Sequence, residues 1–216
     1  MLLGIDTCGA VGSVALAAWD GKNARLLGMT ELAGKTFSSD LLPVLQALLS
    51  EHALEADALN AIVAVRGPGS FTGVRIGLST VKGLSEALDI PVVAVSRLAL
   101  LARKAGTKSA ALDAGRREIY FGETVAETFA ERVISVSDAP SAAQVAVCEE
   151  SLASLPGAVR VADPTAWDAI EAALDRLWAD DYEDVAALDA NYVRRSDAEL
   201  YGKPVLASLE HPPAGA

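Results

Sequence analysis

The chain has 216 residues, enough for one large domain or two small ones, and 51% of them are hydrophobic, which excludes a largely disordered protein. Its 18 basic residues face 29 acidic ones, so a net charge of −11 argues against holding nucleic acid or an anionic membrane by bulk electrostatics. We expect no signal peptide and no membrane span, because the first six residues lack a basic region and no apolar run is long enough. The composition predicts a cytoplasmic globular protein.

The first half predicts three antiparallel strands followed by alternating helices and strands. The expected strands are 2–5, 13–19, 24–30, 61–65 and 90–95, and the expected helices follow Asp40 and cover 70–88 and 96–105. Ser38, Ser39 and Asp40 offer N-cap oxygens to the first of these helices, and we place Pro43 within its first turn.

The second half predicts a similar beginning. A strand at 109–112 ends at Asp113, and a returning strand follows at 118–125, so the pattern strand, aspartate, turn, strand occurs once per half. Further expected elements are helix 142–152, strand 158–161, helix 165–178 and a short helix 184–189, with 211–216 as a frayed tail. The apolar stripe of helix 165–178 is expected to be Trp167, Ile170, Leu174, Leu177 and Trp178.

Charge divides the chain into the same two halves. Residues 1–104 hold nine basic and nine acidic residues, whereas residues 105–216 hold nine basic and twenty acidic residues. We therefore predict two lobes, 1–104 and an acidic 105–216.

The most unusual stretch is a glycine-rich loop that leads into a helix, Arg66-Gly-Pro-Gly-Ser-Phe-Thr-Gly-Val-Arg-Ile-Gly77. Backbone N–H groups at a helix start suit an anion, although the lysine and the spacing of a P-loop are missing. Gly73 and Gly77 lie one turn apart, and each costs about 1 kcal/mol relative to alanine, so a compensating contact is expected. We favour a groove without side chains, into which another helix packs.

The helix that follows Asp40 has leucines on more than one face, namely Leu41, Leu42, Leu45, Leu48 and Leu49. Such a helix usually lies in a core. An apolar surface wider than one stripe needs cover on both sides, however, and a partner protein is one way to provide it.

Asp6 and Thr7 close the first strand, as Asp113 closes its counterpart in the second half. An aspartate at a strand end is most often a turn former. The pairing of Asp6 with Asp113 also suits a magnesium–nucleotide, which makes a phosphotransferase or ATPase the alternative function.

Other catalytic chemistry has little support in the sequence. Cys8 and Cys148 form no CxxC pattern, so a zinc site of the usual spacing is not expected. His52 and His211 follow a leucine-rich helix and lie in the tail, respectively, and neither is a persuasive general base for a peptidase.

Several segments together resemble the TsaB (YeaZ) family. They are Gly4-Ile-Asp-Thr7, Ser13-Val-Ala-Leu16, Leu41-Leu-Pro43, the glycine-rich loop, Lys82-Gly-Leu84, Asp113-Ala114, Arg117-Glu-Ile-Tyr120 and Tyr192-Val-Arg194. The loop motif is long and specific, and the first half is matched more densely than the second.

The resemblance implies an α/β, two-lobed actin-like ATPase fold (ASKHA, ribonuclease H-like) with mixed sheets and flanking helices. It implies a non-catalytic subunit for making threonylcarbamoyladenosine on tRNA, paired with TsaD and joined by the small ATPase TsaE. Alone, the chain would form a homodimer, and tRNA would be bound only through the assembled complex. No metal or cofactor of its own is implied, with ATP and magnesium at most at the interface of the complex.

The resemblance also implies which residues contact the partner. They are Leu41, Leu42, Leu45, Leu48, Leu49, Gly69, Ser70, Phe71, Thr72, Gly73, Ile76 and Gly77. TsaD-type proteins bind metal through two histidines four residues apart on a helix, and this chain has no such pair. In one place the chain departs from the family, which often has His-Ser-Glu where this chain has Phe37-Ser-Ser-Asp40.

Overall fold

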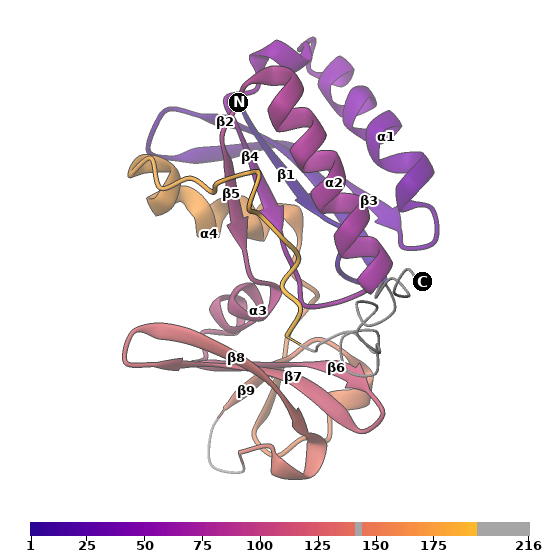
Figure 1. The fold of residues 1–216 in the computed structure, drawn as a ribbon, viewed down its shortest axis with the longest axis vertical. Coiled ribbons are helices and arrows are strands. Elements are labelled where there is room, and N and C mark those ends of the chain that lie inside the picture. The colour runs from indigo at the N-terminus through magenta and orange to yellow at the C-terminus, as the bar shows by residue number, and fades with distance from the viewer. Residues whose placement is uncertain (141–143, 194–216) are drawn as a thin grey trace, which may run out of the picture.

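A computed structural model describes residues 1–140 and 144–193, which form two five-stranded sheets stacked end to end (Figure 1). We call the sheet of strands β1–β5 with its helices the first lobe, and the sheet of strands β6–β10 the second lobe. The chain passes from the first lobe to the second and then returns to the first.

The first sheet has the strand order β3-β2-β1-β4-β5. Its strands are β1 (Leu2–Asp6), β2 (Val11–Trp19), β3 (Ala24–Ala33), β4 (Ala61–Val65) and β5 (Val92–Val95). Strand β1 pairs antiparallel with β2 and parallel with β4, and both β1 and β4 are buried along their whole length. Continuous apolar strands of this kind need helices on both faces. The predicted chain order of three antiparallel strands followed by alternating helices and strands is confirmed.

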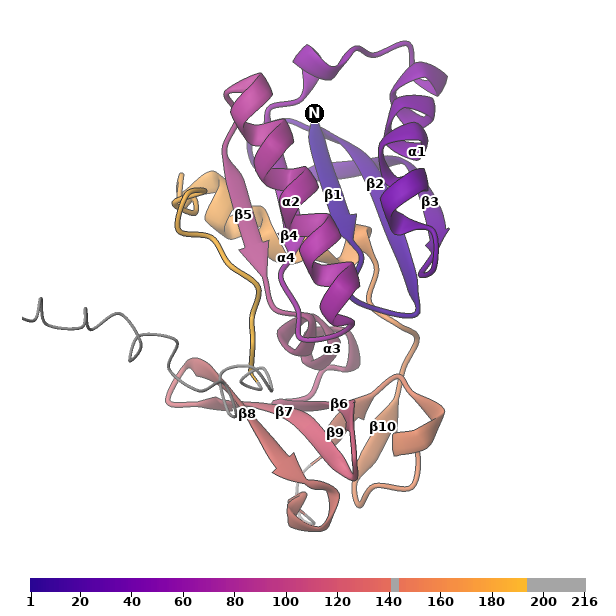
Figure 2. The same ribbon diagram turned by 45° about the vertical axis from the view of Figure 1, so that its right-hand side comes forward.

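Helices cover both faces of this sheet. Helices α1 (Phe37–Glu51) and α2 (Phe71–Leu88) lie side by side on one face, and α4 (Ala166–Trp178) crosses the other face (Figures 1 and 2). Ile170 of α4 belongs to the core of the first lobe. Residues 105–216 therefore do not all lie in the second lobe, because α4 returns to bury its apolar side against the first sheet.

Helix α3 (Arg97–Ala105) lies between the two sheets (Figure 1). Ser96 caps it, since the Ser96 hydroxyl accepts hydrogen bonds from two backbone N–H groups of the first turn. Leu100 packs into the core of the first lobe, whereas Leu98 and Leu101 pack against strands of the second. Helix α3 thus packs its leucines against both lobes.

The second sheet has the strand order β10-β9-β6-β7-β8. Its strands are β6 (Ser109–Gly115), β7 (Glu118–Val125), β8 (Thr128–Ser135), β9 (Val145–Val147) and β10 (Ala158–Arg160). Short 3₁₀ turns occur at Ala56–Ala58, Val136–Asp138 and Glu150–Leu152. Strand β8 was not predicted, and the predicted helix 142–152 is wrong, because the β-branched residues of β9 are buried between β6 and β10.

Several local predictions about helices are also wrong. Helix α1 begins at Phe37 after Thr36, which makes no side-chain cap, so Pro43 lies inside the helix and not in its first turn. The predicted helix 184–189 is a turn. In α4 the buried face is formed largely by alanines, and Trp178 is 63% exposed.

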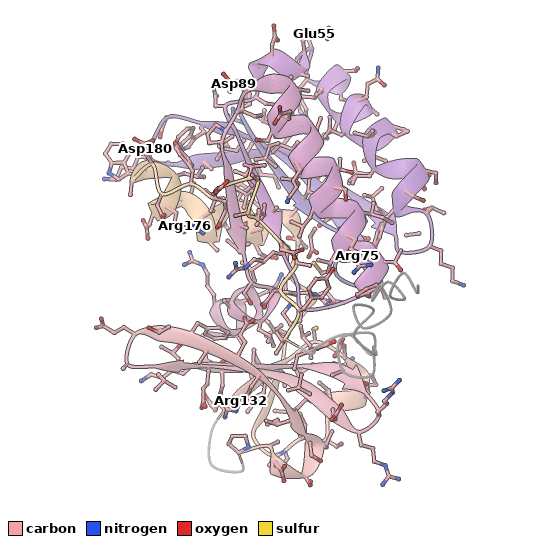
Figure 3. All side chains as sticks on the ribbon, in the orientation of Figure 1. Glu55, Arg75, Asp89, Arg132, Arg176 and Asp180 are labelled. Atoms are coloured by element: carbon pink, nitrogen blue, oxygen red, sulfur yellow. The ribbon has the colours of Figure 1, made fainter. Side chains whose placement is uncertain are left out.

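The segment after α4 runs back along the edge of the first lobe to the lobe boundary (Figure 1). The Glu183 N–H donates to the carbonyl of Val92, and the Asn191 N–H donates to the carbonyl of Arg66, each at 2.8 Å. Arg176 of α4 points toward this segment (Figure 3) and pairs with Glu183 at 3.1 Å. Arg194 and the predicted tail 211–216 lie outside the described residues.

Candidate functional site

The two glycines of the α2 motif face the interior of the chain. A methyl group added to Gly73 would lie 2.1 Å from the carbonyl oxygen of Thr7, and one added to Gly77 would lie 2.2 Å from Thr7 Oγ1. Thr7 Oγ1 donates a 2.8 Å hydrogen bond to the carbonyl of Gly73. The prediction that these glycines form a docking groove is wrong, because the end of β1 already fills the space.

Phe37 fills the space beside these glycines. Its ring is 1% exposed and would lie 2.6 Å from a methyl group on Gly12 and 3.2 Å from one on Gly73. The aromatic side chain that stands where the family often has histidine is therefore a core residue joining α1, α2 and the β1–β2 turn.

The leucine-rich helix α1 also turns most of its leucines inward. Four of the five predicted contact leucines are buried in the core of the first lobe, namely Leu41, Leu45, Leu48 and Leu49. Leu42 is 54% exposed. The prediction that all five face a partner is wrong, because the helix covers β2 and β3 with this side.

The exposed middle of α1 and one row of α2 are nevertheless free of charge, although Arg75 and Glu86 are exposed elsewhere on α2. In α1, the exposed positions between its ends are Leu42, Pro43, Gln46, Ala47 and Ser50. In α2, one outward row at helical spacing is Thr72, Ile76, Thr80, Gly83 and Ala87. Nothing lies within 4 Å of a methyl group added to Gly83, so Gly83 is the glycine of α2 that faces solvent. We call these ten residues the α1–α2 face.

An aromatic cluster borders this face at the start of α2. Phe71 is 49% exposed, and its ring centre lies 5.7 Å from that of Tyr192. Arg75 lies at the same end of α2 (Figure 3), 3.7 Å above the Phe71 ring, and its Nε donates a 2.7 Å hydrogen bond to the Tyr192 hydroxyl. The cluster fixes Phe71 and attaches the segment that follows α4, here called the C-terminal segment (179–193), to α2. Gly69 and Ser70 precede it, with the Ser70 hydroxyl capping the helix.

A cleft of about 650 Å³ lies between the lobes. Its walls come from the β1–β2 turn, the β3–α1 loop, the start of α2, α3 and the end of β6, and its polar lining residues include Lys35, Ser70, Arg97, Asp113 and Glu149. Asp113 accepts hydrogen bonds from the Gly115 N–H and the Ser151 hydroxyl. Of the three residues predicted to hold a nucleotide, Asp113 lines this cleft.

Asp6 and Thr7 are each only 1% exposed and do not line the cleft. Asp6 Oδ1 accepts a 2.8 Å hydrogen bond from the Cys8 N–H, and Thr7 is engaged with α2. Burial raises the pKa of Asp6, while the charge of Arg97 and the Cys8 hydrogen bonds oppose this rise. In this arrangement the two residues stabilise the β1–β2 turn and do not reach a ligand in the cleft.

Arg97 lies against this turn, beside Gly9. It is the first residue of α3, 4% exposed, and its guanidinium pairs with Asp163 at 2.9 Å. Burial disfavours its charge, but the negative charges of Asp6 and Asp163 help to raise the pKa of Arg97 above its ordinary value. Sequence reasoning missed this residue. A cation at a helix N-terminus opposes the helix dipole and was the available signal.

The cysteines are free and are poor nucleophiles. Burial raises the pKa of the Cys8 thiol well above its usual range and raises that of Cys148 to about 12. Because the thiolate is the reactive form, neither group would be activated at neutral pH.

The alternative function predicted from the sequence would place a magnesium–nucleotide between the lobes, and the residues here do not fit one. Asp6 is shielded from the cleft by the turn and faces a resident guanidinium. Within residues 1–140 and 144–193, no three His, Cys, Asp or Glu side chains are arranged to hold a metal ion.

The sequence matches one protein family over more than half of its length. The family model, described as TsaD: tRNA N6-adenosine threonylcarbamoyltransferase, matches residues 29–174. The chain is 36% identical over 132 residues to the tRNA threonylcarbamoyladenosine biosynthesis protein TsaB of Haemophilus influenzae, a match covering 58% of this chain and 54% of that protein. It is 36% identical over 128 residues to the Escherichia coli protein of the same name, covering 56% and 54%. The chain thus spans about half the length of these curated relatives.

The fold is similar to that of a solved structure. YeaZ from Pseudomonas aeruginosa superposes with a TM-score of 0.73 at 28% identity, covering 88% of this chain and 98% of that chain. The predicted two-lobed, actin-like (ribonuclease H-like) fold with mixed sheets and flanking helices is confirmed. Among the helices within the described part of the chain, none combines the length and apolar character that crossing a bilayer requires.

Proposed function

The chain belongs to the TsaD (tRNA N6-adenosine threonylcarbamoyltransferase) family, and from this premise we propose that it is a non-catalytic subunit in forming threonylcarbamoyladenosine on tRNA. Its similarity to proteins named TsaB supports the assignment to this modification. Its partner in this proposal is a catalytic TsaD protein, bound through the α1–α2 face.

The observation that carries the proposal is the uncharged α1–α2 face of a chain with net charge −11. Protein interfaces are depleted of charged residues at their centre and enriched in aromatic residues. Leu42 and Phe71 are exposed near the starts of the two helices and supply apolar anchors. Gly83 lets a partner helix approach the α2 backbone closely, the role that was expected of Gly73 and Gly77.

The buried state of Asp6, Thr7 and Cys8 supports a non-catalytic role. We further propose that the chain pairs with itself through the same face when alone, that TsaE joins the complex, and that tRNA is bound only by the assembly. The net charge of −11 supports the last point, because phosphate contacts come from lysine and arginine. The cytoplasmic location stays a prediction.

Two substitutions of equal exposure test the docking face. Leu42 in α1 and Val125 at the end of β7 are each 54% exposed, so glutamate at either position is tolerated by the fold to a similar degree. Leu42→Glu places an unpaired charge in the proposed interface and should weaken TsaD binding by about a hundredfold or more, measured by titration calorimetry. Val125→Glu should leave the affinity unchanged. Equal affinities for both variants would refute the interface.

A further inference from the structure

We propose that the guanidinium of Arg97 is a resident cation that holds the two lobes together, in the place where an ATPase of this fold would use a bound metal–nucleotide. The lobes on the two sides of the cleft are therefore held in place by side chains of this chain, without a nucleotide. This inference concerns the lobe boundary and does not depend on the proposed docking face.

The position of Arg97 is built by the backbone on both sides. Its N–H donates a 2.8 Å hydrogen bond to the carbonyl of Gly67, which fixes the start of α3 against the glycine-rich loop. A methyl group added to Gly9 would lie 2.8 Å from a guanidinium nitrogen, so the β1–β2 turn admits the guanidinium because this residue has no side chain. The guanidinium is thus enclosed and not a mobile surface group.

The acids around Arg97 come from three separate segments. Asp6 ends β1 in the first lobe, Glu149 follows β9 in the second lobe, and Asp163 lies on the return to α4. Asp163 forms the ion pair of 2.9 Å, and the Arg97 charge favours ionisation of both Asp6 and Glu149, against burial. One cation therefore acts on acids of both lobes. Asp163 is 56% exposed, whereas Asp6 is buried, and a charge buried to that degree needs an opposite charge nearby.

The helix dipole makes this arrangement specific. Arg97 occupies the first position of α3, where the positive end of the helix disfavours a cation. Only nearby carboxylates can compensate for that cost at a 4% exposed site. Within the described residues these carboxylates are not arranged to hold a metal ion, whereas the guanidinium pairs directly with Asp163.

A second contact from the same helix start also joins the two lobes. The Ser96 hydroxyl and the Asn191 amide both donate to Glu131 on β8, so the second lobe is tied to α3 and to the C-terminal segment. Ser96 and Arg97 therefore attach the first turn of α3 to both lobes.

A double-mutant cycle tests whether Arg97 holds the lobes together. Arg103→Met is the matched control, because Arg103 is an exposed arginine of the same helix. Arg97→Met should leave Asp6 buried without its counter-ion and shift the unfolding equilibrium by on the order of a hundredfold, with faster amide exchange in residues 6–12. Asp6→Asn combined with Arg97→Met should recover at least half of the loss in melting temperature. Arg103→Met should behave like the original chain.

Each outcome decides the proposal. If Arg97→Met does not fold, the double variant should still fold. A double variant that is no more stable than Arg97→Met would overturn the proposed role of Arg97. Mg²⁺ with ADP should leave the melting temperature of the original chain unchanged. Stabilisation by Mg²⁺ with ADP that disappears in Asp6→Asn would show a metal–nucleotide site and also overturn it. None of these measurements involves a partner protein, so the docking proposal can fail independently.

Discussion

Gly77→Ala should destabilise the chain, whereas Gly83→Ala, the same change in the same helix, should stabilise it. Alanine is favoured over glycine within a helix by about 1 kcal/mol at both positions. Nothing lies within 4 Å of the added methyl group at Gly83, so the gain there is kept. At Gly77 the methyl group would lie 2.2 Å from Thr7 Oγ1, a distance that forces Thr7 to move.

The cost at Gly77 has two parts. Overpacking in a tight core costs about 1–3 kcal/mol. Rotation of Thr7 also breaks the 2.8 Å hydrogen bond to the carbonyl of Gly73, which is worth about 1 kcal/mol. After the gain in helix propensity, Gly77→Ala should lose about 1–3 kcal/mol, and the two variants should differ by about 2–4 kcal/mol.

Urea denaturation of the original chain and both variants measures this difference, with an unchanged m-value as the control for two-state unfolding. Thr7→Ala removes the blocking hydroxyl, so the double variant with Gly77→Ala should be more stable than the sum of the two single losses. If Gly77→Ala were as stable as Gly83→Ala, the assignment of Gly77 to internal packing would be refuted.

Three further outcomes follow from the structure. Burial raises the pKa of Asp6 and Glu149, so the folded state favours their protonated forms. Their stabilising contribution is therefore complete below their ordinary pKa values and is lost as the pH rises through the raised values. Asp6→Asn should reduce this loss in thermal melts across pH. Thr165→Ala removes the capping box of α4 and should cost about 1 kcal/mol by urea denaturation, with a loss under about 0.3 kcal/mol contradicting the cap. Tyr192→Phe keeps the ring but removes the bond to Arg75, so Phe71 should remain in place by aromatic NMR shifts while stability falls by at most about 1 kcal/mol.

The first lobe was predictable because its signals are local. Buried strands such as β4 are continuous apolar runs, and Ser70 and Ser96 mark helix starts by their capping hydroxyls. The start of α1 was predicted wrongly because its local signal is misleading. Thr36 makes no side-chain cap, and the strong cap formers Ser39 and Asp40 lie inside the helix. Caps identify a helix start only where the side chain is used.

Strand β9 could not be read from local pattern. Three residues, Val145–Val147, form it, and an alanine-rich context precedes them in sequence. Their strand conformation comes from parallel pairing with β6 and β10, which lie more than ten residues away on either side. Tertiary context overrides propensity for segments this short.

The site shows the same division between what is local and what is not. The absence of side chains at Gly73 and Gly77 was correctly recognised as a close-contact signal, but periodicity cannot tell whether another protein or Thr7, 66 residues earlier, fills the space. For Arg97, three acids from distant segments come together only in the folded chain.

The β1–β2 turn connects the proposed docking face to the lobe boundary. Thr7 supports α2 from below, Gly12 accommodates the Phe37 ring at the start of α1, and the neighbouring Asp6 faces Arg97. The Ser70 N–H donates a 2.8 Å hydrogen bond to the carbonyl of Cys8, so the first turn of α2 is attached to the same loop. Packed contacts of this kind do not deform continuously. The proposed docking face and the lobe boundary therefore depend on one short stretch of backbone.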